Sequence, residues 1–164
     1  MDIKMIMFQL AVGRATAKGP QLTYKGTPVY VSDDVCQSMC LNNVVPFVGV
    51  CPVRFPSQRE GEVTYCIFCN NKFMELPEDV RAPVFEHELG HVVHKHSDKN
   101  NTPTLWDVFG FKGKYLQQEM EADAYAAAIV GKDAIIKALK TVVKDYPFFS
   151  RLLMQHRYKA LNKL

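Results

Sequence analysis

Residues 85–97 read FEHELGHVVHKHS and hold four of the chain's five histidines within ten residues. His87 and His91 bracket Glu88 in the pattern His-Glu-x-x-His. In a helix, residues four apart lie on one face about one turn from each other, so both imidazoles can point at a single metal ion. Glu88 is rotated by about 100° from His87, where it can meet a water at the metal instead of the metal itself. The stretch therefore predicts a metal-binding helix.

The remaining residues of this stretch fit a packed helix. Phe85, Leu89, Val92 and Val93 supply apolar surface, and Gly90 lets another element approach closely. The alternative is a solvated polar helix. We disfavour it because the pattern should arise by chance in fewer than roughly one chain in a hundred.

A tetrahedral catalytic zinc needs a third protein ligand and an open fourth position for water. His94 and His96 follow closely, but their spacing misses the metzincin pattern by one residue. We expect His94 at the rim of the site or on the surface. We expect His96 to be a capping or packing residue near the C-terminal end of the helix.

Residues 115–131, YLQQEMEADAYAAAIVG, offer a better third ligand. At helical spacing, Glu119 and Asp123 fall on a face that is otherwise apolar, formed by Leu116, Met120, Ala127 and Val130. Unpaired carboxylates on a core-facing stripe are costly, so they need partners. A metal ion for Glu119 and a histidine for Asp123 would satisfy both. Glu121 is rotated toward the solvent-facing side, so we choose Glu119 as the ligand.

HELGH followed by Glu-x-x-x-Asp on a second helix resembles the gluzincin metallopeptidases. Within them, EMEADAYAA and HELGHVVHKH are similar to segments of the prenyl-protein endopeptidase and its bacterial membrane relatives. The order of strand, active-site helix and glutamate helix also resembles the small soluble peptidases that cleave phage-type repressors. Those usually have Asn where this chain has Asp123. The likeness covers residues 62–131, and residues 1–55 match nothing that we recognise.

The resemblance implies that His87, His91 and Glu119 bind one zinc ion. It implies that Glu88 is the general base and that Asp123 accepts a hydrogen bond from a ligand histidine, for which we choose His87. The chemistry of these residue types supports each role, because three protein ligands leave a position for water. A carboxylate behind a ligand histidine fixes its tautomer.

The resemblance also implies a substrate-binding strand and a donor that stabilises the transition state. The strand at residues 62–69 would be an edge strand that takes extended substrate as an added strand, with Tyr65, Ile67 and Cys69 on one face. A plain sheet strand is the alternative. For the transition state we name His156 and Arg157, with a solvated helix face as the alternative.

Composition limits the other possibilities. The chain has 164 residues, of which 48% are hydrophobic and 23% charged, and its net charge is +3. We expect one domain over residues 1–164, no nucleic-acid partner and no membrane span. The odd count of five cysteines favours free thiols in the cytoplasm. A structural zinc held by the pairs Cys36/Cys40 and Cys66/Cys69 is the disfavoured alternative.

The element pattern predicts an α+β fold with a mostly antiparallel N-terminal sheet, an active-site helix and C-terminal helices in a zincin-like domain. We expect strands within residues 4–31, including one at 29–31, and further strands within 42–60 and at 62–69. Helices are expected at residues 32–41, 83–97, 114–130, 132–143 and 147–161. The loop around Trp106 is expected to pack on the core, with a lid over the cleft as the alternative.

The leading functional hypothesis is a zinc endopeptidase that acts on an extended polypeptide or peptide. A metal-binding regulatory protein of the same fold without turnover is one alternative. A peptide-deformylase-like amidase, with Cys51 as the third ligand, is another.

Overall fold

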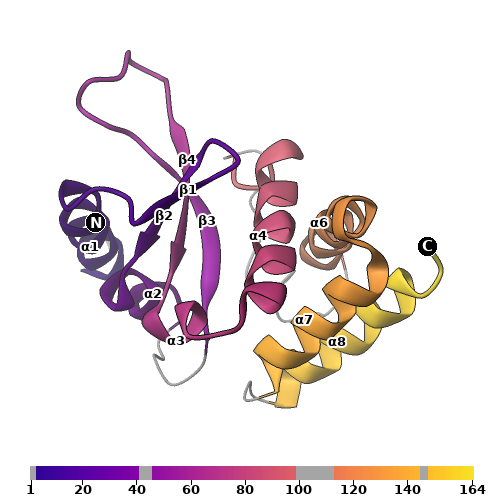
Figure 1. Ribbon diagram of the computed structural model, residues 1–164. Coiled ribbons are helices and arrows are strands. Elements are labelled where there is room, and N and C mark those ends of the chain that lie inside the picture. The colour runs from indigo at the N-terminus through magenta and orange to yellow at the C-terminus, as the bar shows by residue number, and fades with distance from the viewer. Residues whose placement is uncertain (1–2, 41–45, 99–112, 145–147) are drawn as a thin grey trace. The chain divides into compact units, whose positions relative to one another are not determined.

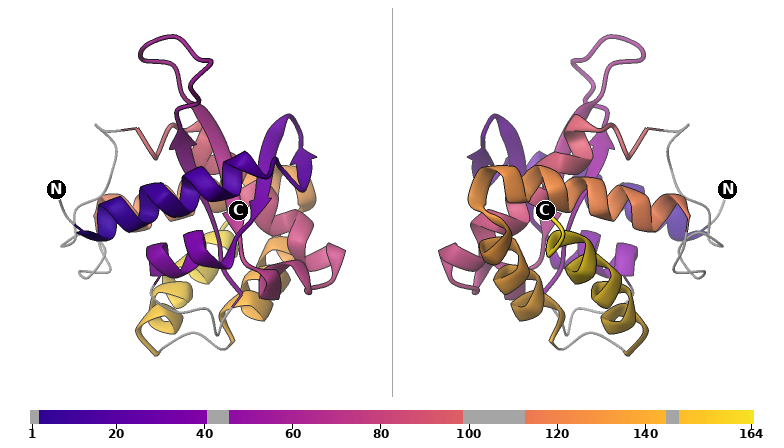
Figure 2. Two further views of the ribbon diagram at one scale, coloured as in Figure 1. Left: turned by 90° about the vertical axis from the view of Figure 1, so that its left-hand side faces the viewer. Right: turned by 90° about the vertical axis from the view of Figure 1, so that its right-hand side faces the viewer.

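The computed structural model describes residues 3–40, 46–98, 113–144 and 148–164. The chain divides into two compact units, Met1–Leu76 and Pro77–Leu164. The first unit holds a four-stranded sheet and three helices among its described residues, and the second is helical (Figures 1 and 2). The predicted α+β class is confirmed. The single domain and its zincin-like arrangement stay predictions. The residues around Trp106 lie outside the described part of the chain.

The sheet of the first unit has the strand order β1-β2-β4-β3. Its strands are β1 (Leu22–Tyr24), β2 (Thr27–Val31), β3 (Val48–Val53) and β4 (Thr64–Cys69). β1 and β3 run antiparallel to their neighbours, whereas β2 and β4 are parallel to each other. Two of the three pairings are therefore antiparallel, and the sheet is mixed.

β4 lies inside the sheet, so the prediction of an edge strand at residues 62–69 is wrong. Every residue of β4 from Thr64 to Cys69 pairs with β3, and Ile67 to Cys69 also pair with β2 on the other side. Ile67 and Cys69 are buried, and Tyr65 is half-buried. Tyr65, Ile67 and Cys69 thus form part of an internal strand and are not a docking edge for substrate.

Helix α1 (Ile3–Ala17) corrects the prediction of strand at the N-terminus. Phe8, Ala11, Val12 and Ala15 recur at helical spacing, and all four contribute to the core of the first unit. The apolar run was misread because a short apolar stretch does not by itself distinguish a strand from a helix. The strand predicted at residues 29–31 and the strand expected within 42–60 are both confirmed.

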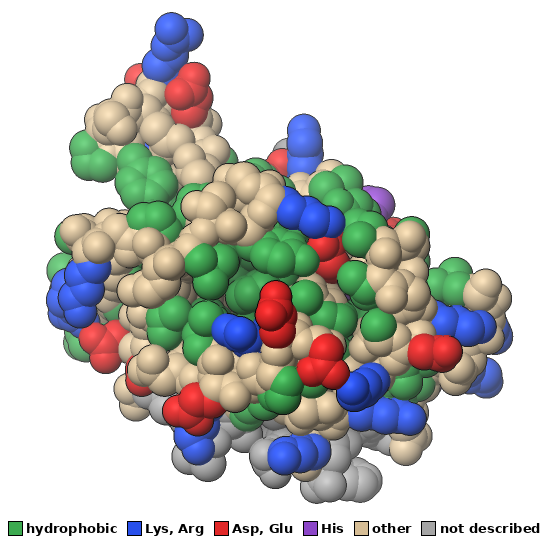
Figure 3. All heavy atoms as spheres, in the orientation of Figure 1, with side chains coloured by type: hydrophobic (Ala, Val, Ile, Leu, Met, Phe, Trp, Pro, Cys, Tyr) green, Lys and Arg blue, Asp and Glu red, His purple; other side chains and the backbone are tan. Residues whose placement is uncertain are grey.

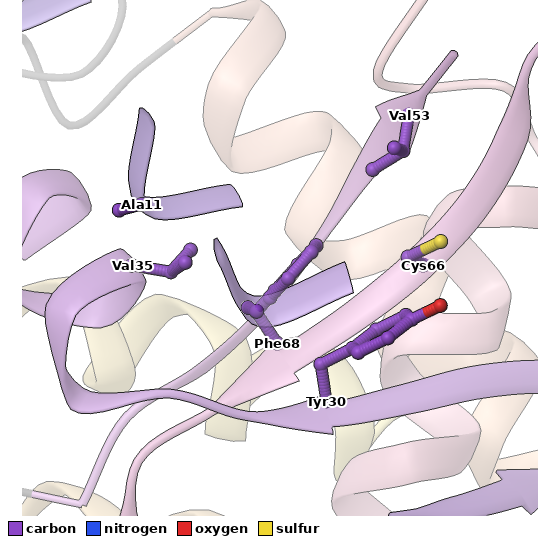
Figure 4. Packing of buried hydrophobic residues seen from close by; sticks show 7 residues of the cluster. Ala11, Tyr30, Val35, Val53, Cys66 and Phe68 are labelled. Carbon is purple, nitrogen blue, oxygen red and sulfur yellow. The ribbon is translucent and has the colours of Figure 1, made fainter. Parts of the chain in front are cut away.

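Helix α2 (Asp33–Cys40) confirms the helix predicted to begin after Ser32. The Ser32 hydroxyl accepts a hydrogen bond from the Val35 amide at 3.3 Å, as an N-cap residue does. Val35 joins Tyr30, Val53, Cys66 and Phe68 in the core that Figure 4 shows, where the Tyr30 and Phe68 rings stack at 5.3 Å. A short helix, α3 (Asn71–Met74), follows β4.

The second unit consists of α4 (Glu78–Val93), α6 (Lys114–Val130), α7 (Lys132–Val143) and α8 (Phe148–Leu161). The last three agree with prediction to within one residue. Gly131, with φ of 85°, separates α6 from α7 in a conformation that L side chains rarely adopt. Ile135, Leu139 and Leu161 pack with Ala126 in a small core.

Helix α4 begins and ends earlier than predicted. It includes Pro83 as an interior residue, whereas the prediction placed this proline at the helix start. It ends at Val93 because Lys95 adopts φ of 54°, in the left-handed region. His96 therefore lies beyond the helix, in the turn that closes it.

Figure 3 shows acidic and basic side chains interspersed on the face that it presents. Among the helices described, none combines the length and the hydropathy needed to cross a membrane.

Candidate metal centre

Three side chains of the second unit bring metal-binding atoms together. His87 and His91 come from α4, and their Nε2 atoms lie 3.1 Å apart. Glu119 comes from α6, and its carboxylate oxygens lie 3.5 Å from each of these nitrogens. Ligands about 2.0–2.1 Å from a tetrahedral ion lie about 3.3–3.4 Å from one another. The three donors could therefore hold one metal ion after only small movements.

Gly90 explains how Glu119 reaches the two histidines. A Cβ atom at Gly90 would lie 2.8 Å from Cα and 3.0 Å from the carbonyl oxygen of Ala122. The backbones of α4 and α6 can approach this closely only because residue 90 has no side chain. Glu119 lies about one turn before Ala122 on α6, and His87 and His91 flank Gly90 on α4. The close approach predicted for Gly90 from the sequence is thus present.

Asp123 supports the first histidine directly. Its Oδ1 lies 2.8 Å from Nδ1 of His87, and both side chains are almost fully buried. A carboxylate at this distance accepts the Nδ1 proton, which leaves the Nε2 lone pair of His87 directed at the metal position. The structure therefore places Asp123 against the histidine that we chose from the sequence.

Arg157 of α8 contacts the carboxylates of both Glu119 and Asp123. Its guanidinium donates two hydrogen bonds to Asp123, at 2.7 Å and 2.6 Å, and contacts Glu119 Oε2 at 2.8 Å. This fork matches the planar geometry of a carboxylate. Burial, the largest single influence, would raise the pKa of Asp123 and of Glu119, but the charge of Arg157 and the contacts with His87 together outweigh it and lower both pKa values.

These contacts correct the role predicted for the pair His156 and Arg157. Arg157 is 3% exposed and its donors already serve two acids, so it is not a free donor for a transition state. His156 is exposed on α8. We assign to Arg157 the task of holding Glu119 and Asp123 in place. No pattern in the sequence indicates this role, because an arginine in a late helix usually lies in solvent.

The charges of the cluster favour a bound cation. Arg157 offsets only one of the two negative charges that Glu119 and Asp123 carry. Burial and Arg157 disfavour a proton on His87, yet the two carboxylates prevail and raise the pKa of His87 to about 9. Burial instead lowers the pKa of His91 to about 3, so this ring stays neutral. A divalent cation could replace the proton on His87 and supply the missing positive charge.

Glu88 lies between His87 and Leu89 on α4 and is 6% exposed. The structure thus buries Glu88 beside His87, and its role as general base stays a prediction.

A second group of polar side chains adjoins the first. His96 Nδ1 lies 2.9 Å from His91 Nδ1, and His96 Nε2 lies 2.9 Å from Glu121 Oε2. His94, His96 and Glu121 form another set, whose donor atoms lie within 4.8 Å of one another. The sequence predicted a solvent-facing Glu121 and a packing or capping His96. His96 does pack, on His91 at the C-terminal end of α4, and the Glu121 side chain is 40% exposed, but the hydrogen bond between His96 and Glu121 was not predicted.

The cysteines that the structure describes take no part in either group. Cys36, Cys66 and Cys69 are buried, and Cys51 is half-buried. Burial, assisted by the neighbouring Cys66, raises the pKa of Cys51 to about 12, and burial raises the pKa of Cys66 to about 11. Both are therefore protonated thiols at physiological pH when no metal is bound.

Comparison with protein-family models, with curated protein sequences and with solved structures finds no match to this chain. The interpretation of the site therefore rests on its own geometry.

Proposed function

We propose that the chain is a zinc-dependent endopeptidase that hydrolyses peptide bonds of an extended polypeptide. The observation that carries this proposal is the convergence of His87, His91 and Glu119 on one point, with Glu88 next to His87. Two imidazoles and one carboxylate are the donor set of catalytic zinc in several peptidases, with the fourth position left for water. Zinc is favoured over magnesium or calcium because those ions prefer oxygen ligands.

Bound zinc would polarise the scissile carbonyl and lower the pKa of a water molecule toward neutrality. Glu88 would accept the proton of the attacking water and deliver it to the nitrogen of the leaving amine. Asp123 would keep His87 in the tautomer that presents Nε2, and Arg157 would hold Glu119 and Asp123 in their positions. The acid–base step and the orientation of the ligands would thus come from different residues.

Glu119 also decides between this proposal and the amidase alternative. The amidase hypothesis takes its third ligand from Cys51, which lies on β3 of the first unit and belongs to neither cluster of donor atoms among the described residues. Glu119 supplies a third donor from within the second unit, and its lowered pKa keeps it ionised. The donor set therefore supports the peptidase hypothesis over the amidase hypothesis.

The test is cleavage of a peptide library by the wild type and by Glu88→Gln, with zinc content measured for both. We expect about one zinc ion per chain in each protein and cleavage by the wild type alone. Glu78→Gln is the matched control, because it makes the same chemical change at an exposed position in the first turn of α4. It should cleave like the wild type.

Two results would contradict the proposal. Equal cleavage by the wild type and Glu88→Gln would exclude Glu88 as the base. Zinc binding without cleavage by the wild type would favour the regulatory metal-binding protein instead.

A further inference from the structure

We propose that His96 and Glu121 form a second support for the metal centre, which fixes the tautomer of His91 through a hydrogen bond between the two histidines. His96 is then a positioning residue that acts on the metal through His91. The inference rests on the metal-binding part of the proposed function and adds to it. Asp123 supports His87 directly, and Glu121 supports His91 through one intervening ring.

The turn that closes α4 brings His96 to His91. The His96 amide donates to the carbonyl of His91 at 2.9 Å, and the Lys95 amide donates to the carbonyl of Val92 at 3.0 Å. With Lys95 in the left-handed conformation, these are the two hydrogen bonds of a Schellman motif. In that motif the side chain after the left-handed residue packs on the side chain five residues earlier, and an apolar pair usually occupies these positions. Here the pair is His96 and His91.

The proton positions follow from one choice. If His91 binds the metal through Nε2, its single proton is on Nδ1, which lies 2.9 Å from Nδ1 of His96. A neutral His96 can accept that proton only if its own proton is on Nε2. Nε2 of His96 lies 2.9 Å from a carboxylate oxygen of Glu121, which accepts it. One assignment, with one proton on each ring, satisfies the whole chain from Glu121 to the metal.

A neighbouring side chain holds the Glu121 carboxylate in position to accept the His96 proton. Its second oxygen accepts a hydrogen bond from Nε2 of Gln117 at 2.8 Å, one turn earlier on α6. His96 is 6% exposed, so the imidazole end of its hydrogen bond to Glu121 is shielded from solvent.

A second metal ion at His94, His96 and Glu121 fits the same atoms less well. It would need the Nε2 lone pair of His96, whose proton would then move to Nδ1 and face the Nδ1 proton of His91. The His94 and His96 rings also stack at 5.4 Å with an interplanar angle of 15°, so their in-plane lone pairs do not converge. The observations therefore favour a support for His91 over a separate metal site.

The experiment compares zinc affinity, by chelator competition, among wild type, His96→Phe, Glu121→Gln and His94→Phe. Phe keeps the ring but cannot accept the His91 proton, so His96→Phe should bind zinc about tenfold to a hundredfold more weakly. Glu121→Gln should weaken binding in the same direction by a smaller factor. His94→Phe is the matched control and should bind like the wild type, because no hydrogen bond joins His94 to His91 among the described contacts.

Histidine ¹⁵N NMR of the zinc-loaded wild type gives a readout that a merely structural role would not produce. We expect the proton of His91 on Nδ1 and that of His96 on Nε2. The opposite tautomer at His96, or two zinc ions per chain falling to one in His94→Phe, would overturn the proposal. Wild-type affinity in both His96→Phe and Glu121→Gln would also overturn it, and the proposed function would survive. A wild type that binds no zinc would reject both.

Discussion

Both units bury apolar side chains, but among the described residues only the second buries a cluster of charged ones. The core of the first unit consists of Tyr30, Val35, Val53, Phe68 and similar residues, with cysteines kept as neutral thiols. The second unit buries Arg157, Glu119 and Asp123 together with His87. Buried ion pairs seldom stabilise a protein more than apolar residues of the same volume would. The contrast teaches that the second unit is built around a site, and that its stability depends on keeping charges paired.

Among the variants considered, Arg157→Met should lower the unfolding free energy the most. It leaves Glu119 and Asp123 buried without their cation, and breaking such a cluster costs about 3–5 kcal/mol of unfolding free energy. Urea denaturation of the metal-free protein measures the loss.

Arg14→Met is its control in the first unit. Arg14 pairs with Asp34 at 3.4 Å, but both side chains are more than half exposed. Removing an exposed pair should change the unfolding free energy by about 0–1 kcal/mol. Similar losses of unfolding free energy in Arg157→Met and Arg14→Met would contradict the idea that only the second unit depends on buried, paired charges.

Gly90→Ala should destabilise the protein by about 1–3 kcal/mol and weaken zinc binding, because the new Cβ forces α6 away from α4. Gly13→Ala makes the same change in α1, where nothing lies within 4 Å of the added atom. There alanine should stabilise the helix by about 0.5–1 kcal/mol. Thermal unfolding tests whether the two variants change stability in opposite directions, and chelator competition tests the loss of zinc binding in Gly90→Ala. A stabilising Gly90→Ala would contradict the close approach of the two helices.

Zinc should stabilise the second unit selectively. At about 100 times the dissociation constant, a ligand that binds only the folded state adds about 2.7 kcal/mol. Amide hydrogen exchange with and without zinc should therefore show slower exchange in α4 and α6 and little change in β2 and β4. Equal slowing in all four elements would show that the units unfold together.

The smallest effect concerns the thiols of the first unit. Because the pKa values of Cys51 and Cys66 are raised to about 12 and about 11, few of these thiols ionise at pH 8. Both should react slowly with iodoacetamide in the folded protein and rapidly in urea, as mass spectrometry of the labelled peptides would show. Fast labelling of folded Cys66 would contradict its burial.

The sequence predicted those parts of the centre that follow from helical spacing. His87, His91, Glu119 and Asp123 are brought together by two helices, and their phase is visible in a single chain. The close approach at Gly90 was predicted for the same reason. The boundaries of α6, α7 and α8 also came from local signals, such as Gly131 after α6.

The features that were missed depend on contacts distant in sequence or on a turn. The internal position of β4 follows from its pairing with both β2 and β3, which no local pattern specifies. Arg157 meets its acids only after α8 packs on α6. The contact of His96 with His91 requires Lys95 to adopt a left-handed conformation, and a lysine gives no such signal where glycine would.

The position of Arg157 sets an order of events during synthesis. On the ribosome, both histidines and both acids emerge before the guanidinium that neutralises those acids. A nascent chain that ends before α8 would hold both carboxylates beside His87 without the guanidinium that contacts both of them. The centre can therefore reach its final geometry only when translation has passed residue 157.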